Sequence, residues 1–142
     1  PIDIMNKNII KDLTKKGNIV IASGGGGIPV INNNGQLLGI DAVIDKDLAA
    51  SLLAAEIGAD EFIILTDVPK VYINFHKPNQ KAIDKMSVRT ARKYAKDGQF
   101  AAGSMGPKIE AAIKFVKNGG KEAIITEANE LLNPAAGTKI VK

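Results

Sequence analysis

Three short runs of apolar residues constrain the fold of this chain more than any other feature. They lie at 19–22, 61–66 and 123–126, and each is too short and too continuous for an amphipathic helix. Such runs are typical of buried strands in a parallel sheet. Segments with helical periodicity separate them, at 46–57, 87–97 and 108–117. The alternation predicts an α/β fold whose mainly parallel sheet is covered by helices on both faces.

Weaker signals complete the predicted order of elements. All of the segments belong to one predicted domain, residues 1–142. The further elements are a helix over Asp3–Lys16, a hairpin turn at Asn32–Gly35, a strand over Val71–Phe75 with a turn at His76–Gln80, a helical turn over Glu127–Leu132 and a strand over Thr138–Val141.

Composition narrows the class of partner. The formal charge is only +4, aromatic residues make up 4% of the chain, and the lysines form no block, so anionic small molecules fit better than nucleic acid. The absence of cysteine excludes disulfides and thiolate sites. No apolar run approaches the ~18 residues of a membrane span. We therefore expect a cytoplasmic protein without nucleic-acid or membrane partners.

Four consecutive glycines, Gly24, Gly25, Gly26 and Gly27, follow the first apolar run. A run of this kind is costly in conformational entropy, and an ordinary turn needs only one or two glycines. It indicates a backbone that approaches a ligand closely and turns its amides towards an anion, although a flexible loop is the alternative. The segment matches neither the Walker A pattern nor Gly-x-Gly-x-x-Gly, because Pro29 occupies the place of the third glycine.

Lys46 lies between Asp45 and Asp47 at the start of the helix predicted over 46–57. Asp45 is placed as N-cap, Asp47 falls in the first turn, and Gly58 is the stop signal. A cation is unfavourable at a helix N-terminus, so an anion in front of the helix would compensate for Lys46. The alternative is a solvated lysine between two acids.

A second lysine, Lys108, follows the turn Gly103-Ser104-Met105-Gly106-Pro107 at another predicted helix start. Free amides at such a turn favour a phosphate. Two lysines directed at one point would stabilise the charge of a transferring phosphoryl group. Asp45 and Asp47 would hold these lysines, and one of the two acids could bind Mg²⁺.

Asp67 ends the second apolar run, where ligand-facing residues lie in α/β sheets. A turn aspartate ahead of Pro69 is the competing interpretation. Tyr72 and Phe75 are better explained as packing residues than as a base-stacking pair, although Tyr72 is close enough in sequence to Asp67 to border a nucleotide.

Four segments together resemble the carbamate kinases of the amino acid kinase superfamily. They are IVIASGGGGIPVI at 19–31, AVIDKDLA at 42–49, LTDV at 65–68 and AGSMGPK at 102–108. The resemblance extends over essentially the whole chain. It implies a three-layer αβα sandwich and reversible phosphoryl transfer between ATP and carbamate, giving carbamoyl phosphate and ADP with Mg²⁺, as in arginine fermentation.

The resemblance also implies roles for individual residues. Lys46 and Lys108 are similar to the lysines that grip the phosphoryl group, and Asp47, with Asp45 beside it, to the acid that organises them. The residues that would line the nucleotide site, called the nucleotide wall below, are Asp67, Val68, Tyr72, Ser104, Met105 and Gly106. Gly24–Gly27 would lie near the reacting centre.

The family's complete chains are about twice this length. The resemblance implies that this chain is the C-terminal, ATP-binding half. The family's N-terminal half carries the loop that binds carbamate, the lid and most of the contact of the expected homodimer. The alternatives are another small-acid kinase of the superfamily and a nucleotide-binding module without catalysis.

Overall fold

A four-stranded sheet lies at the centre of the computed structural model, which describes residues 1–142. Its strands are β3 (Glu61–Thr66), β7 (Glu122–Glu127), β8 (Thr138–Val141) and β6 (Lys85–Ser87), in the spatial order β3-β7-β8-β6. The β3–β7 and β6–β8 pairs are parallel, whereas β7 and β8 are antiparallel. The prediction of an α/β fold with a mainly parallel sheet is confirmed.

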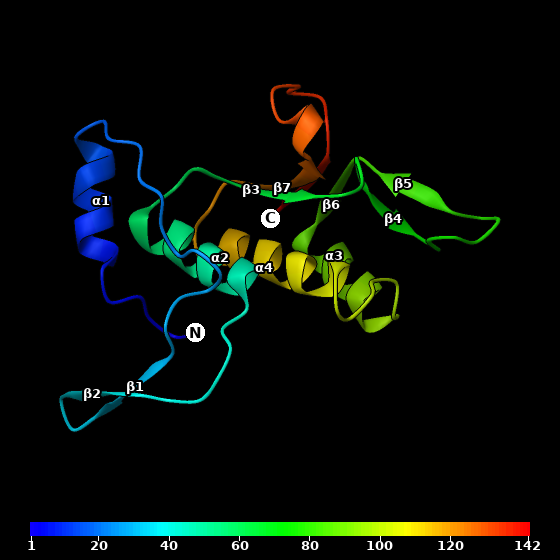
Figure 1. Ribbon diagram of the computed structural model, residues 1–142. Coiled ribbons are helices and arrows are strands. Elements are labelled where there is room, and N and C mark those ends of the chain that lie inside the picture. The colour runs from blue at the N-terminus through cyan, green and yellow to red at the C-terminus, as the bar shows by residue number, and fades with distance from the viewer.

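The helices of the chain pack mainly on one face of this sheet. Figure 1 shows α2 (Lys46–Ile57), α3 (Val88–Lys96) and α4 (Met105–Lys117) on that face, and α1 (Lys7–Lys15) beside α2. Helix α4 is the centre of the core and contributes six buried residues: Ile109, Ala111, Ala112, Ile113, Phe115 and Val116. Within these 142 residues the helices therefore form one layer of the expected sandwich.

Two small hairpins extend from the body. One joins β1 (Val30–Asn33) to β2 (Gln36–Gly39) at the predicted Asn32–Gly35 turn, and the other joins β4 (Val71–Ile73) to β5 (Lys81–Ile83). A short 3₁₀ turn, η1 (Ala128–Glu130), lies within the predicted turn after β7. None of the helices combines the length and apolar character needed to cross a bilayer.

Local capping explains why two predicted helices have the expected bounds. The carboxylate of Asp45 accepts a hydrogen bond from Leu48 N at 2.9 Å, and Gly58 ends α2 in the left-handed conformation. Ser87 caps α3 by accepting a hydrogen bond from Thr90 N at 3.1 Å. Each of these caps involves residues within one helical turn of the helix end, so the local sequence is sufficient to predict it.

Other predicted elements were wrong in their bounds or in their burial. The segment 19–22 is not a buried strand, because no strand pairs with it and Ile19 and Ile21 are each 98% exposed. Helix α1 begins at Lys7 rather than Asp3, and α4 begins at Met105 rather than Lys108. The short strands β5 and β6 were missed because their alternation includes charged residues and few apolar ones.

The connections of α2 and α4 determine where their N-termini lie. Each helix is followed by a turn of a few residues and then by β3 or β7, so it runs antiparallel to that strand. The 12 residues of α2 span about 18 Å, close to the length of a six-residue strand. Both N-termini therefore lie at the edge of the sheet where β3 and β7 end, which is also the position of Asp67.

A buried hydroxyl attaches the β4–β5 hairpin to the sheet. Thr138 of β8 is completely buried, donates to Ile83 O and accepts from Val71 N at 2.8 Å. We expect Thr138→Val to lower the free energy of unfolding by about 2–3 kcal/mol, because the backbone N–H of buried Val71 and the carbonyl of partly buried Ile83 lose a partner. Denaturant unfolding measures the loss.

Thr126 provides the matched control for this prediction. It is also buried, but its hydroxyl has no hydrogen-bond partner in the chain. Thr126→Val should leave the stability unchanged or raise it, since an unsatisfied polar atom is removed. Equal losses of unfolding free energy in Thr138→Val and Thr126→Val would show that the hydrogen bonds of Thr138 do not stabilise the fold.

Candidate functional site

Two lysines from different helices meet at one carboxylate. Asp47 Oδ2 lies 3.2 Å from Lys46 Nζ and 2.9 Å from Lys108 Nζ. The side chains of Asp47 and Lys108 are each only 13% exposed, whereas that of Lys46 is 59% exposed. The structure therefore brings together three of the five charged residues predicted for the site, at the N-terminal ends of α2 and α4.

Opposing effects determine the charge state of the cluster. Burial disfavours the charged form of Asp47, but hydrogen bonds from Lys108 and Lys46 outweigh it and hold the pKa of Asp47 below its usual value of 3.8. The hydrogen bond to Asp47 raises the pKa of Lys46 above 10.5, with further attraction from Asp47. Asp47 and Lys46 are consequently both charged at neutral pH.

Asp45 has a different position from Asp47. Its Oδ1 caps α2 through Leu48 N, and no ion pair joins it to either lysine. The structure thus places Asp45 at the start of the helix that carries Lys46 and Asp47.

The glycine loop contacts the same end of α2. A Cβ at Gly26 would lie 2.1 Å from the carbonyl oxygen of Ile44, the residue before Asp45, and Gly26 has φ +130°. Only glycine fits there, because any side chain would collide with a backbone atom. Gly24, Gly25 and Gly27 have open space around them, so the steric requirement is specific to Gly26.

The predicted nucleotide residues lie on two other segments. Asp67 and Val68 follow β3, and Tyr72 on β4 packs against Phe75 with ring centroids 5.7 Å apart. Asp67 is exposed and accepts a hydrogen bond from the Thr66 hydroxyl at 3.1 Å. No hydrogen bond or ion pair joins Asp67 or Tyr72 to the lysine cluster.

Ser104, Met105 and Gly106 form the start of α4. Gly106 N donates to Ala101 O at 2.8 Å, and a Cβ at Gly106 would lie 3.0 Å from the same oxygen. This tight turn leads directly into the helical turn that carries Lys108. Ser104 makes no side-chain capping bond, so the N-terminal amides of α4 have no side-chain acceptor there.

No three His, Cys, Asp or Glu side chains of the chain converge as metal ligands. Mg²⁺ in phosphoryl-transfer sites is held by one or two carboxylates together with the phosphates, so Asp45 and Asp47 are the available protein ligands. Asp47 Oδ2 is already shared by two ammonium groups, which disfavours a cation at that oxygen.

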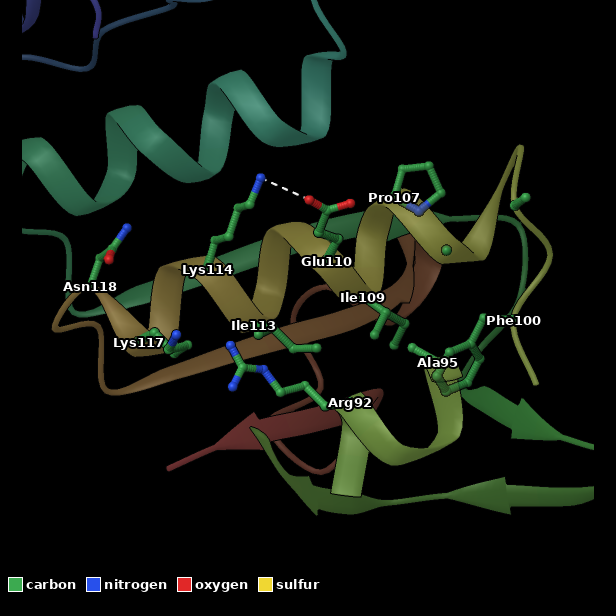
Figure 2. Close-up of a pocket in the computed structure, with 12 residues that line it drawn as sticks. Arg92, Ala95, Phe100, Pro107, Ile109, Glu110, Ile113, Lys114, Lys117 and Asn118 are labelled. Atoms are coloured by element: carbon green, nitrogen blue, oxygen red, sulfur yellow. Dashed lines mark ion pairs between the residues drawn. The ribbon is translucent and has the colours of Figure 1, made fainter. Parts of the chain in front are cut away.

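A cavity lies elsewhere, between α3 and α4. Its volume is about 650 Å³, and Figure 2 shows Arg92 of α3 opposite Ile109 and Ile113 of α4. A Glu110–Lys114 ion pair of 2.8 Å lies at its border. Gly106 is the only predicted site residue that lines it. Lys46, Asp47 and Lys108 do not line this cavity, so the lysine cluster is separate from it.

Comparison with known proteins agrees with the motif order and the fold. A model described as the amino acid kinase family matches residues 1–127. The chain belongs to this family. The carbamate kinase of Thermoplasma volcanium is 54% identical over 144 residues, which cover 99% of this chain and 47% of that protein. The carbamate kinase of Thermococcus kodakarensis is 53% identical over 137 residues, covering 94% and 44%.

A solved structure supports the same grouping. The chain superposes on the carbamate kinase from Giardia lamblia bound to AMP-PNP with a TM-score of 0.94 and 45% sequence identity, over 100% of this chain and 46% of that chain. This family member therefore spans about half the length of the carbamate kinases that it matches.

The pKa of Asp47 predicts how the stability depends on pH. Because this pKa is lower in the folded state, the Asp47 contribution is present above pH 3.8 and is lost as the pH falls through the folded pKa. The difference in unfolding free energy between the parent and Asp47→Asn should be constant from about pH 5 to 8 and shrink below about pH 4. Denaturant unfolding at each pH measures it.

Glu110→Gln is the control for this experiment. Its exposed pair with Lys114 should contribute less than about 0.5 kcal/mol at any pH. An Asp47→Asn difference that stays constant down to pH 3 would show that the lysines do not hold the carboxylate in its charged form.

Proposed function

We propose that this chain is the ATP-binding half of a carbamate kinase, which transfers a phosphoryl group between ATP and carbamate. The observation that carries the proposal is the single carboxylate of Asp47 that receives two lysine ammonium groups at the N-termini of two helices. The identity of about 50% to carbamate kinases over nearly the whole chain supports carbamate as the acceptor.

The lysines match the electrostatic demand of phosphoryl transfer. In the direction of ATP synthesis, the bond between phosphorus and the carbamoyl oxygen breaks, and a bond forms between phosphorus and the terminal oxygen of ADP. The transferring group carries negative charge on its equatorial oxygens, and preorganised cations stabilise that charge. We assign this role to Lys46 and Lys108, with Asp47 holding both before the substrates bind.

The helix ends and the glycine loop complete the proposed site. The partial positive charge at the N-termini of α2 and α4 favours phosphate at the same edge of the sheet. We assign Gly24–Gly27 to the phosphate loop, and Asp67, Val68, Tyr72, Ser104, Met105 and Gly106 to the nucleotide wall. Mg²⁺ would enter with the nucleotide phosphates and add positive charge, with Asp45 as the nearest carboxylate not paired to a lysine.

The homodimer, the cytoplasmic location and a role in arginine breakdown are further parts of the proposal. They belong to the complete enzyme. The binding of carbamate itself would depend on residues outside these 142, because the chain covers less than half of the carbamate kinases it matches.

The catalytic assignment predicts a large loss of turnover. In the complete enzyme, Lys46→Ala and Lys108→Ala should each lower kcat by about 10²–10³, as the loss of one preorganised donor typically does. Lys46→Arg should not restore turnover, because a planar guanidinium cannot replace a compact ammonium. The assay is ATP formation from carbamoyl phosphate and ADP.

Lys114→Ala is a matched control on α4. Lys114 is half exposed and pairs only with Glu110, so its removal should leave kcat within about twofold. Folded Lys46 and Lys108 variants with nearly parental turnover would show that these lysines are solvated and do not contribute to catalysis. Acetylglutamate as a better acceptor than carbamate would favour another kinase of the family.

Nucleotide binding by this chain is a separate prediction. ADP with Mg²⁺ should give measurable heat in titration calorimetry, because the proposed nucleotide wall lies wholly within residues 67–106. Asp67→Ala should weaken this binding, and the distant Glu56→Ala should not. Absence of heat with the folded chain at millimolar ADP would contradict the assigned wall.

A further inference from the structure

A buried serine lies one helical turn from the carboxylate that holds the two lysines. Ser51 of α2 is only 1% exposed, and its hydroxyl donates a hydrogen bond of 2.7 Å to the carbonyl oxygen of Ala111 on α4. Besides the Asp47–Lys108 ion pair, this is the polar contact that joins the two helices. Sequence alone did not indicate it, because its partner is 60 residues away.

The Asp47–Lys108 ion pair and the Ser51–Ala111 hydrogen bond lie one after the other along the α2–α4 pair. Ser51 follows Asp47 by four residues, and Ala111 follows Lys108 by three, so the partners on each helix lie on one face about a turn apart. The two helices run in the same direction. Small residues lie where the helices meet: Ala111 and Ala112 of α4 belong to the core cluster, and Ala54 and Ala55 of α2 pack against that cluster.

The serine constrains the helices more tightly than the ion pair does. A lysine side chain has a flexible four-carbon stem, so Lys108 could reach Asp47 over a range of helix positions. A serine hydroxyl is one bond from its Cβ, and its acceptor here is a backbone atom that moves only with α4. Apolar contacts between alanines are non-directional, so they do not define the axial position by themselves.

We propose that Ser51 is a positioning residue, whose hydrogen bond to Ala111 sets the register of α2 against α4 and thereby the placement of Asp47 beside Lys108. The inference rests on the proposed function. If the register relaxes, Asp47 moves relative to Lys108, and the ammonium groups of both lysines lose the carboxylate that sets their positions. The proposed nucleotide wall lies on β3, β4 and the start of α4, none of which includes α2. Turnover should therefore suffer while nucleotide affinity remains.

The test is the kinetics of Ser51→Ala in the complete enzyme. We expect kcat to fall on the order of tenfold, because displacement of a catalytic group by a fraction of an ångström is costly, with KM for ADP within about twofold. In an Asp47→Asn background, Ser51→Ala should change kcat by less than twofold, since the group it positions is gone. Ser51→Cys retains a weak donor and should give an intermediate kcat.

Ser87→Ala is the matched control. It removes the 3.1 Å hydrogen bond that the Ser87 hydroxyl accepts at the N-cap of α3, so it should lower the melting temperature without lowering kcat. If Ser51→Ala does not fold, the kcat of Ser51→Cys is compared with that of Ser87→Ala in the same way.

The outcomes separate the two proposals. The inference is supported if Ser51→Ala lowers kcat in the parent enzyme but not in the Asp47→Asn background, and if Ser87→Ala does not lower kcat. A Ser51→Ala enzyme with parental kcat, or with the same loss in both backgrounds, overturns it even if Asp47→Asn is inactive. An Asp47→Asn enzyme with parental kcat overturns the proposed function, and the positioning role fails with it.

Discussion

The close packing of α2 against α4 is the contact on which the rest of the structure depends. Alanines on both helices allow it, and it covers the helical face of β3 and β7 while bringing two helix N-termini together. Because each helix runs antiparallel to the strand that follows it, those N-termini lie where the strands end. The fold thereby concentrates free amides and two lysines at one edge of the sheet.

Sequence reasoning succeeded where the determinants are local. Asp45 and Gly58 define α2 within one turn of its ends, and the LTDV and GSMGPK segments carry the family pattern in short stretches. The convergence of Lys46 and Lys108 was predicted from two similar helix starts. The chain order alone, with strands following helices, was sufficient to place both lysines at the same edge.

The failures involve residues whose environment depends on distant segments. Ile19 and Ile21 have the composition of a buried strand, but burial requires a neighbouring strand, and no strand of these 142 residues pairs with them. Ile63 and Leu65 of β3 are exposed for another reason, since they alternate with the buried residues of a paired strand and lie on the face away from the helices. Thr138 was overlooked because the hydroxyl of a strand threonine gives no indication of its partners.

The shared carboxylate of Asp47 has a consequence for how a ligand could enter the site. Each ammonium group has three N–H donors, and Asp47 occupies one of them on each lysine. Two donors on each side chain are left for incoming oxygens, so an anion can bind without displacement of the carboxylate. The rotamers of both lysines would then change little between the empty and the occupied site. Such a site keeps its reorganisation energy small, because its internal counter-ion stays in place when an anion binds.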